Sequence, residues 1–137
     1  RRGRAKRELI STLVSEIIRY KPPVLHRRRP ARADVEIAGR NIGKGDKVVM
    51  WYISGNRDES KIDRADQFII DRAKPRQHLA FGAGMHTCAG SSLANLEAEL
   101  VFTALTRRFP ELRVEGHLRQ ESILVRGLTQ LTLRCDR

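Results

Sequence analysis

The chain lacks several features that would assign it at once to a common class. It has only two cysteines, too few for a disulfide scaffold, and no Cys-x-x-Cys pair that would indicate a structural zinc site. No apolar run approaches the roughly 20 residues of a membrane span. The basic start leads into a helix-forming stretch without a small-residue cleavage site, so we expect no secretory signal and a cytoplasmic location. Aromatic residues are also scarce, so few lie between the basic residues to stack on nucleic-acid bases.

What the chain has in excess is positive charge, with a formal net charge of +11 over 137 residues. Such a charge predicts an acidic partner, namely nucleic acid, an anionic membrane surface or an acidic protein. The basic residues are scattered along the chain, however, and Arg27, Arg28 and Arg29 form its only uninterrupted run of three. Charge alone therefore defines no site. The length and the share of hydrophobic residues predict one soluble domain with its own core.

Hydrophobic periodicity predicts two helices. Residues 8–20 carry apolar side chains at helical spacing until Pro22 and Pro23 stop the pattern. Residues 91–108 repeat this spacing over a longer stretch, and Pro110 marks its end.

Short β-forming runs predict the remaining regular structure. Residues 33–54 combine alternating apolar positions with turn residues, which indicates a small antiparallel sheet. Near the C-terminus, residues 122–126 and 130–135 are predicted to form a hairpin joined through Gly127 and Leu128.

Residues 55–90 show no long periodic pattern, apart from a short helix predicted around residues 64–68. A stretch of this length without regular structure is unusual in a compact domain and usually signals a function or a bound group. Within it, residues 81–90 read FGAGMHTCAG and lie just before the second predicted helix.

Cys88 is the residue of this stretch with the most distinctive chemistry. Just before a helix, its sulfur would lie near unpaired N–H groups and the positive end of the helix dipole, which favours the thiolate form. Gly82, Gly84 and Gly90 flank it and would let the backbone approach a bulky ligand closely. Cys135, by contrast, is interpreted as a small buried hydrophobe.

Three partners are compatible with a thiolate at Cys88. A catalytic cysteine needs a base, which His86 or His78 could supply, although the arrangement matches no cysteine-protease pattern. A zinc ion needs further ligands that the spacing does not supply. Haem iron needs only one axial protein ligand, and thiolate is the ligand of the oxygen-activating class.

Residues 81–90 resemble the haem-binding motif of the cytochrome P450 superfamily, F-G-x-G-x-[HR]-x-C-x-G. Glu16 and Arg19 form the E-x-x-R motif of the superfamily in the first predicted helix, and residues 22–58 are similar to soluble bacterial members almost throughout. The resemblance covers essentially the whole chain. Every specified place of the haem-binding motif is filled, by Phe81, Gly82, Gly84, His86, Cys88 and Gly90.

The resemblance implies a fold class and a cofactor. Residues 1–137 would be a single partial domain of α+β content, the C-terminal haem-binding part of the mainly α-helical P450 fold. The cofactor would be haem b, with Cys88 as the proximal iron ligand and Phe81 shielding its sulfur. His86 and Arg29 match positions that hydrogen-bond the haem propionates, a charge-assisted contact. For Arg29 a plain solvated role is the alternative.

By the same resemblance, Glu16 and Arg19 form a buried ion pair that braces the haem site. An arginine from a later segment should complete it. The chain departs here from the common P-E-R-F pattern, since residues 65–68 read ADQF. We therefore expect Arg72, four residues after Phe68, to take that role.

The implied reaction is insertion of one oxygen atom from O2 into a C–H bond of a lipophilic small molecule. A ferredoxin or flavin-type donor would supply electrons, and its acidic surface would suit the basic chain. The acid–alcohol motif of the family, [AG]-G-x-[DE]-[TS], is absent. We therefore expect no catalytic residue here, a part of a longer product or a truncated gene, and a chain that is inactive alone with exposed apolar surface. The alternatives are a haem-binding remnant without catalysis and a basic nucleic-acid-binding module.

The substrate is indicated only in outline. Residues 50–63 and 68–82 are similar to bacterial hydroxylases of alkanes, fatty acids or terpenes. Neither nucleic acid nor a membrane span is expected to take part. The residues expected to contact the substrate are mostly apolar, as pocket walls generally are, and comprise Val24, Leu25, His26, Ile123, Leu124 and Val125.

Overall fold

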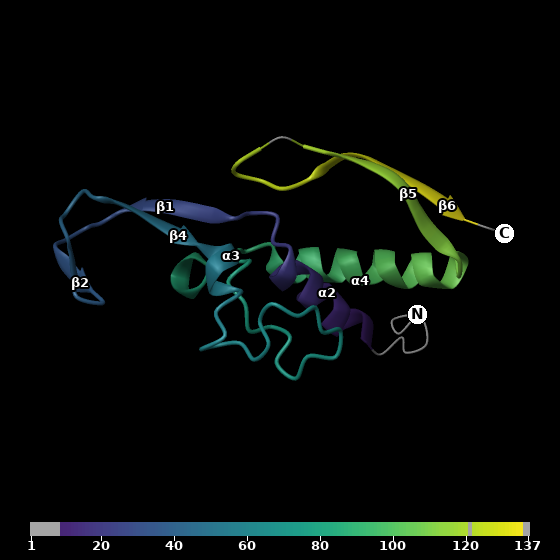
Figure 1. Cartoon of the computed structure of the whole chain (residues 1–137), viewed down its shortest axis with the longest axis horizontal. Coiled ribbons are helices and arrows are strands. Elements are labelled where there is room, and N and C mark those ends of the chain that lie inside the picture. Colours follow the sequence, from purple (N-terminus) through teal and green to yellow (C-terminus); the bar gives the residue numbers. More distant parts are fainter. Residues whose placement is uncertain (1–8, 121, 136–137) are drawn as a thin grey trace.

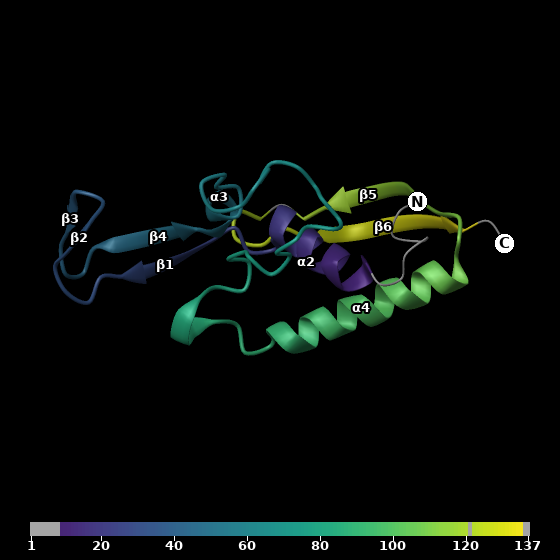
Figure 2. The ribbon, with the colours of Figure 1, turned by 90° about the horizontal axis from the view of Figure 1, so that it is seen from below.

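The computed structural model describes residues 9–120 and 122–135 (Figure 1). Two helices, α2 (Ile10–Tyr20) and α4 (Ser91–Arg108), pack against each other (Figures 1 and 2). They are the two helices that periodicity predicted. Only residue 8 of the prediction falls outside the described residues.

A pair of antiparallel strands extends away from the helices as an arm (Figure 1). It consists of β1 (His26–Pro30) and β4 (Lys47–Trp51). The sequence predicted β4 but not β1, because consecutive arginines hide any apolar alternation. After β4 the β-forming run ends in a single helical turn, α3 (Tyr52–Gly55).

A second pair, β2 (Val35–Ile37) and β3 (Arg40–Ile42), lies at the tip of this arm (Figure 2). Ala38 and Gly39 turn the chain with φ of 50° and 74°, the left-handed conformation that a two-residue hairpin turn requires. The prediction of one small sheet within residues 33–54 is therefore wrong in topology. Its strands belong to two separate sheets, because β4 pairs with β1.

The C-terminal hairpin joins β5 (Leu112–Arg119) to β6 (Leu128–Cys135). The predicted hairpin is wrong in its first strand, because β6 pairs with β5 and not with residues 122–126. Those residues lie in the connection, where Val125 forms one isolated bridge with Val24.

The hairpin carries one irregularity in each strand. The ladder skips Glu115 in β5 and Thr129 in β6, so each strand contains a bulge. Gly116 beside the first bulge interrupts the apolar alternation of β5, which is why this strand was not predicted. Cys135 is exposed rather than buried as expected, since every residue of β6 is exposed.

The long segment between α3 and α4 contains turns and one 3-10 turn, η2 (Gly84–His86). The short helix predicted around residues 64–68 is wrong. Arg64 has a φ of 46°, a left-handed conformation that a right-handed helix cannot accommodate.

The buried core is small, largely polar and centred on α2. The longer helix α4 contributes no buried residue. In the described part of the chain, no helix has both the length and the apolar character needed to cross a bilayer. The buried residues are Ile10, Val14, Pro22, Ile62 and Ala65 among the apolar ones, and Ser15, Glu16, Arg19, Asn56 and Arg72 among the polar ones.

Candidate haem site and its supporting network

A buried ion pair on α2 is the centre of the polar network. Glu16 and Arg19 are three residues apart, so they project from the same side of the helix. Arg19 donates through Nε to Glu16 Oε2 and through Nη2 to Oε1, both at 2.8 Å. Neither side chain has exposed surface. A bidentate pair of this kind fixes the orientation of both groups.

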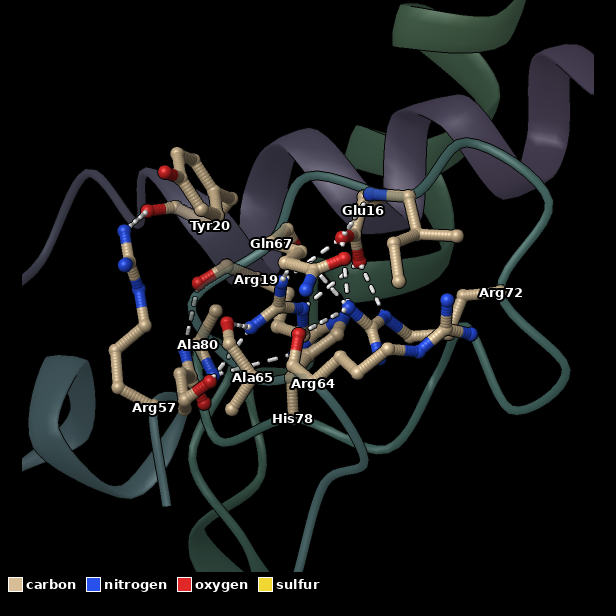
Figure 3. A network of polar contacts seen from close by, with 12 residues as sticks. Glu16, Arg19, Tyr20, Arg57, Arg64, Ala65, Gln67, Arg72, His78 and Ala80 are labelled. Carbon is tan, nitrogen blue, oxygen red and sulfur yellow. Dashed lines mark hydrogen bonds and ion pairs between the residues drawn. The ribbon is translucent and has the colours of Figure 1, made fainter. Parts of the chain in front are cut away.

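Arg72 reaches the same carboxylate from the irregular segment (Figure 3). Its Nε donates to Glu16 Oε2 at 3.0 Å and its Nη2 to Oε1 at 3.2 Å. The backbone N–H of Ile69 also donates to Oε1, at 2.8 Å. The structure thus brings together the three residues that the sequence grouped as an ion-pair network.

Burial alone would raise the pKa of Glu16, because it removes the carboxylate from water. The hydrogen bonds from Arg19, Arg72 and Ile69 outweigh this effect and lower the pKa of Glu16 from 4.5 to about 2. The carboxylate is therefore ionised at neutral pH and balances the guanidinium groups beside it.

Both arginines use their remaining donors on backbone carbonyls. Arg19 donates to the carbonyl oxygens of Asn56 and Ala65, both at 2.7 Å, and to that of Gln67 at 3.0 Å. Arg72 donates to the Gln67 carbonyl as well, at 3.0 Å. These carbonyls lie in a segment without helix or strand, so the guanidinium groups supply hydrogen bonds that regular structure would otherwise provide.

Asn56 joins this network to the segment that leads to the cysteine loop. It is fully buried. Its Nδ2 donates to the carbonyl oxygen of Arg19 at 3.2 Å, and its Oδ1 accepts the N–H of Leu79 at 2.6 Å. Sequence reasoning gave Asn56 no role, because a contact across 23 positions leaves no local pattern.

Arg57 contacts the C-terminal end of α2 and stabilises it. Its guanidinium carbon lies 3.9 Å from the centroid of the Tyr20 ring, a cation–π contact. Its Nη2 donates to the Tyr20 carbonyl at 3.0 Å, and its Nη1 pairs with Asp66 at 2.7 Å. The rings of Tyr20 and Phe68 pack in a T-shaped arrangement, with centroids 5.5 Å apart.

The cysteine loop begins at Phe81 and leads to Gly90. The N–H of Cys88 donates to the carbonyl oxygen of Phe81 at 2.8 Å and so closes the loop. Gly82 and Gly84 have φ of 76° and 68°. Residues with side chains rarely adopt this conformation, which accounts for glycine at both positions.

The loop leads directly into α4. The Cys88 carbonyl accepts the N–H of Ser91 at 3.2 Å, and the Gly90 carbonyl accepts the N–H of Ala94 at 2.9 Å. A Cβ on Gly90 would lie 3.9 Å from the Cys88 sulfur, so this glycine leaves space beside it. Cys88 is exposed, at the N-terminal end of an 18-residue helix.

The two histidines predicted as candidate bases for Cys88 differ in their environment. His86 is exposed in η2, and within the described residues no hydrogen bond joins a histidine to Cys88. His78 accepts the N–H of Ala80 through Nδ1 at 3.3 Å. Burial lowers the pKa of His78, and the charge of Arg19 lowers it further. No group of three or more His, Cys, Asp or Glu suited to a metal ion occurs in the described part of the chain.

Two segments expected to contact substrate lie next to each other. Val24 forms a β-bridge with Val125, and Leu25 accepts the N–H of Ile53 at 3.3 Å. Ile123 is 82% exposed. A cavity of about 450 Å³ lies beside these residues and is lined by His26, Arg27, Arg28, Val49 and Leu124.

Arg29 is exposed on β1, opposite Val48 in the strand register. Its Nη1 donates to the carbonyl oxygen of Arg28 at 3.1 Å. No acidic side chain pairs with it among the described residues. Its charge is thus available to a carboxylate.

This fold and this network define the class of protein. The family model for cytochrome P450 matches residues 2–128, and the chain belongs to the cytochrome P450 family. Membership implies a haem cofactor and confirms the family that the motifs indicated.

Two relatives show the extent of the likeness. Linalool 8-monooxygenase of Pseudomonas putida is 44% identical over 131 residues, which cover 95% of this chain and 32% of that protein. Methyl-branched lipid omega-hydroxylase of Mycobacterium bovis is 40% identical over 126 residues, which cover 90% of this chain and 29% of that protein. The chain therefore spans about a third of the length of these relatives.

Solved structures agree with this assignment. CYP109E1 from Bacillus megaterium, in complex with testosterone, matches with a TM-score of 0.93 and 34% identity, over 99% of this chain and 38% of that one. P450BioI, in complex with an acyl carrier protein ligated to hexadec-9Z-enoic acid, matches with a TM-score of 0.93 and 35% identity, over 98% and 35%. The prediction of a partial α+β P450 fold is confirmed.

Proposed function

We propose that this chain forms the haem-binding part of a cytochrome P450 monooxygenase and that Cys88 is the axial ligand of the haem iron. One observation carries the proposal. The thiol of Cys88 is exposed on a loop with glycines at positive φ, directly before α4, in a chain of a haem-binding family. Thiolate is the ligand of the oxygen-activating haem proteins.

The surroundings of Cys88 suit an iron porphyrin. A single axial ligand is enough for haem iron, and one accessible sulfur is what the loop offers. Gly90 leaves room beside the sulfur, so a flat macrocycle would be able to approach the backbone. Haem b, when bound, would supply the redox-active iron at which dioxygen is activated.

The other residues of the motif would hold and shield this group. Phe81 is half-buried and tied to Cys88 through its carbonyl, so its ring would limit access of water to the sulfur. His86 and Arg29 are exposed donors that would bind the two propionates. Gly82 and Gly84 would let the loop follow the edge of the macrocycle.

The Glu16 network would fix the segment on which the loop is built. Arg19 and Arg72 bind the carbonyls of that segment as well as the carboxylate. A preorganised support of this kind keeps an axial ligand within the narrow range of positions that ligation requires.

The substrate that we propose is a lipophilic small molecule, oxidised by insertion of one oxygen atom from O2 into a C–H bond. The names of two relatives support a lipophilic substrate, since linalool and methyl-branched lipids are lipophilic. An acidic ferredoxin or flavin-type donor in the cytoplasm would supply electrons, which fits the net charge of +11.

The test is the spectrum of the ferrous carbonyl complex. The haem-loaded protein is reduced and treated with carbon monoxide, and we expect the strongly red-shifted Soret band of thiolate ligation. Cys88→Ala should remove this band completely, because the ligand is gone. Cys135→Ala is the matched control and should leave it unchanged, since Cys135 lies at the end of β6. A Cys88→Ala variant that keeps the band would overturn the proposal.

A further inference from the structure

We propose that Asn56 is a positioning residue for the Cys88 loop. In this role it couples the buried Glu16 network to the segment that carries Phe81. The inference rests on the proposed function of Cys88 as the iron ligand. It gives a role to a residue that belongs neither to the cysteine motif nor to the ion-pair network.

Asn56 is bonded on two sides. Towards α2, its Nδ2 donates to the Arg19 carbonyl at 3.2 Å, and its own carbonyl accepts from Arg19 Nη1 at 2.7 Å. Towards the loop, its Oδ1 accepts the N–H of Leu79 at 2.6 Å. Because Asn56 has no exposed surface, water cannot replace these bonds without opening the structure.

Two further backbone hydrogen bonds lead from Leu79 to the cysteine. The Leu79 carbonyl accepts the N–H of Gly82 at 2.8 Å, and the Phe81 carbonyl accepts the N–H of Cys88 at 2.8 Å. A shift of Leu79 would therefore move Phe81 and, through it, the backbone that carries the sulfur.

The helical turn α3, just before Asn56, contacts the same segment. A Cβ on Gly55 would lie only 2.7 Å from Leu79 Cδ1, so the Leu79 side chain packs directly on this glycine. The hydroxyl of Tyr52 lies 3.8 Å from the position that a Cβ on Gly82 would occupy. The segment before the loop is thus held by packing at α3 and by a buried hydrogen bond at Asn56.

A positioning role and a purely structural role predict different outcomes. If Asn56 only stabilised the fold, its loss would lower the yield of folded protein while the folded fraction kept normal ligation. If Asn56 sets the loop, folded and haem-loaded protein would itself show altered ligation, because small displacements of a preorganised group have large effects.

Two variants separate these roles in the full-length, haem-loaded protein. Asn56→Ala removes both side-chain bonds. Asn56→Asp has nearly the same shape and can still accept the Leu79 N–H, but it places an oxygen against the Arg19 carbonyl. We expect the fraction of ferrous carbonyl complex with the red-shifted Soret band to fall by about half or more in both variants. The matched control is Asn41→Asp on β3, an exposed position that should leave the band unchanged.

Amide hydrogen exchange gives a second readout that does not depend on haem. In the wild-type protein the Leu79 amide should be protected relative to the exposed loops. In Asn56→Ala the exchange rates of the Leu79 and Cys88 amides should rise by about tenfold, as expected for loss of a buried hydrogen bond. A wild-type protein without the red-shifted band would refute ligation by Cys88, and exchange would still decide the role of Asn56.

The positioning role is overturned by either of two results. One is a Leu79 amide that exchanges in the wild type as fast as the exposed loops. The other is a set of folded Asn56 variants with the full red-shifted band and unchanged exchange at Leu79 and Cys88, even if their yield is low.

Discussion

The two helices α2 and α4 lie side by side but differ in what they bury. α2 buries five residues, three of them polar, and its charged groups find their partners within this chain. α4 buries none, and four of its apolar side chains are more than half exposed, namely Leu93, Leu96, Leu100 and Val101. An apolar surface of this kind is typical of a face that packs against something else. The chain thus contains a buried polar network around Glu16, in which the charges are paired, next to an exposed apolar face on α4.

The difference shows how an irregular segment is held in place. The segment after α3 has no ladder of its own, yet its carbonyls at Ala65 and Gln67 are bound by buried guanidinium groups. A buried ion pair often contributes little net stability compared with an apolar replacement, but losing one partner is costly. Its value here lies in the fixed geometry it gives to the segment that ends in the cysteine loop.

The largest expected effect comes from breaking the buried ion-pair network of Glu16 on α2. Glu16→Ala should lower the free energy of unfolding by about 3–5 kcal/mol, because it leaves Arg19 and Arg72 buried without a counter-charge. Denaturant unfolding measures the loss, and stable haem incorporation should be lost with it. The matched control is Glu115→Ala, since Glu115 pairs with Arg134 at 3.4 Å on the surface and should contribute at most about 1 kcal/mol. Equal losses in the two variants would contradict the comparison.

A somewhat smaller effect is expected from acid. The pKa of Glu16 is about 2 in the folded chain, below its ordinary value of 4.5, so the unfolded state binds a proton more readily. This stabilises the fold by about 3 kcal/mol at pH values above 4.5, and the contribution is lost as the pH falls from 4.5 towards about 2. Denaturant midpoints across this range test the sign. In Glu16→Gln this part of the pH dependence should disappear, and its persistence would assign the effect to other groups.

The smallest effect sharpens the contrast between the two helices directly. Val14 on α2 is 1% exposed, so Val14→Ala should lower the stability of the 137-residue chain by about 1–3 kcal/mol. Leu100 on α4 is 61% exposed, so Leu100→Ala should change it by less than about 0.5 kcal/mol. Thermal or denaturant unfolding of both variants decides the point. A larger loss from Leu100→Ala than from Val14→Ala would show that α4 is covered in solution.

The parts of the fold that follow from local patterns could be predicted from the sequence. Both long helices show a clear period, and proline follows each of them. The strands β1 and β5 could not be found in this way. Three arginines occupy the middle of β1, and Gly116 with its neighbouring bulge breaks the alternation of β5. Their pairing depends on partners far away in the chain, which a short window does not contain.

The residues of the candidate site likewise differ in whether a local sequence pattern reveals them. Glu16 and Arg19 are recognisable because their motif lies within one helix, and the structure places Arg72 against them. The contact of Asn56 with Leu79 joins two irregular segments and has no periodic pattern to reveal it. That Cys88 binds the haem iron is a proposal, and it depends on the cysteine motif.

The bulges at Glu115 and Thr129 have a consequence for the behaviour of the chain in solution. A hairpin of two long strands offers two open edges, and each edge can recruit a strand from another molecule. Here each strand carries one unpaired residue, so neither edge presents an unbroken row of evenly spaced amides and carbonyls. The irregular hairpin is therefore a poor template for intermolecular sheets. Self-association should begin at the exposed apolar face of α4 instead.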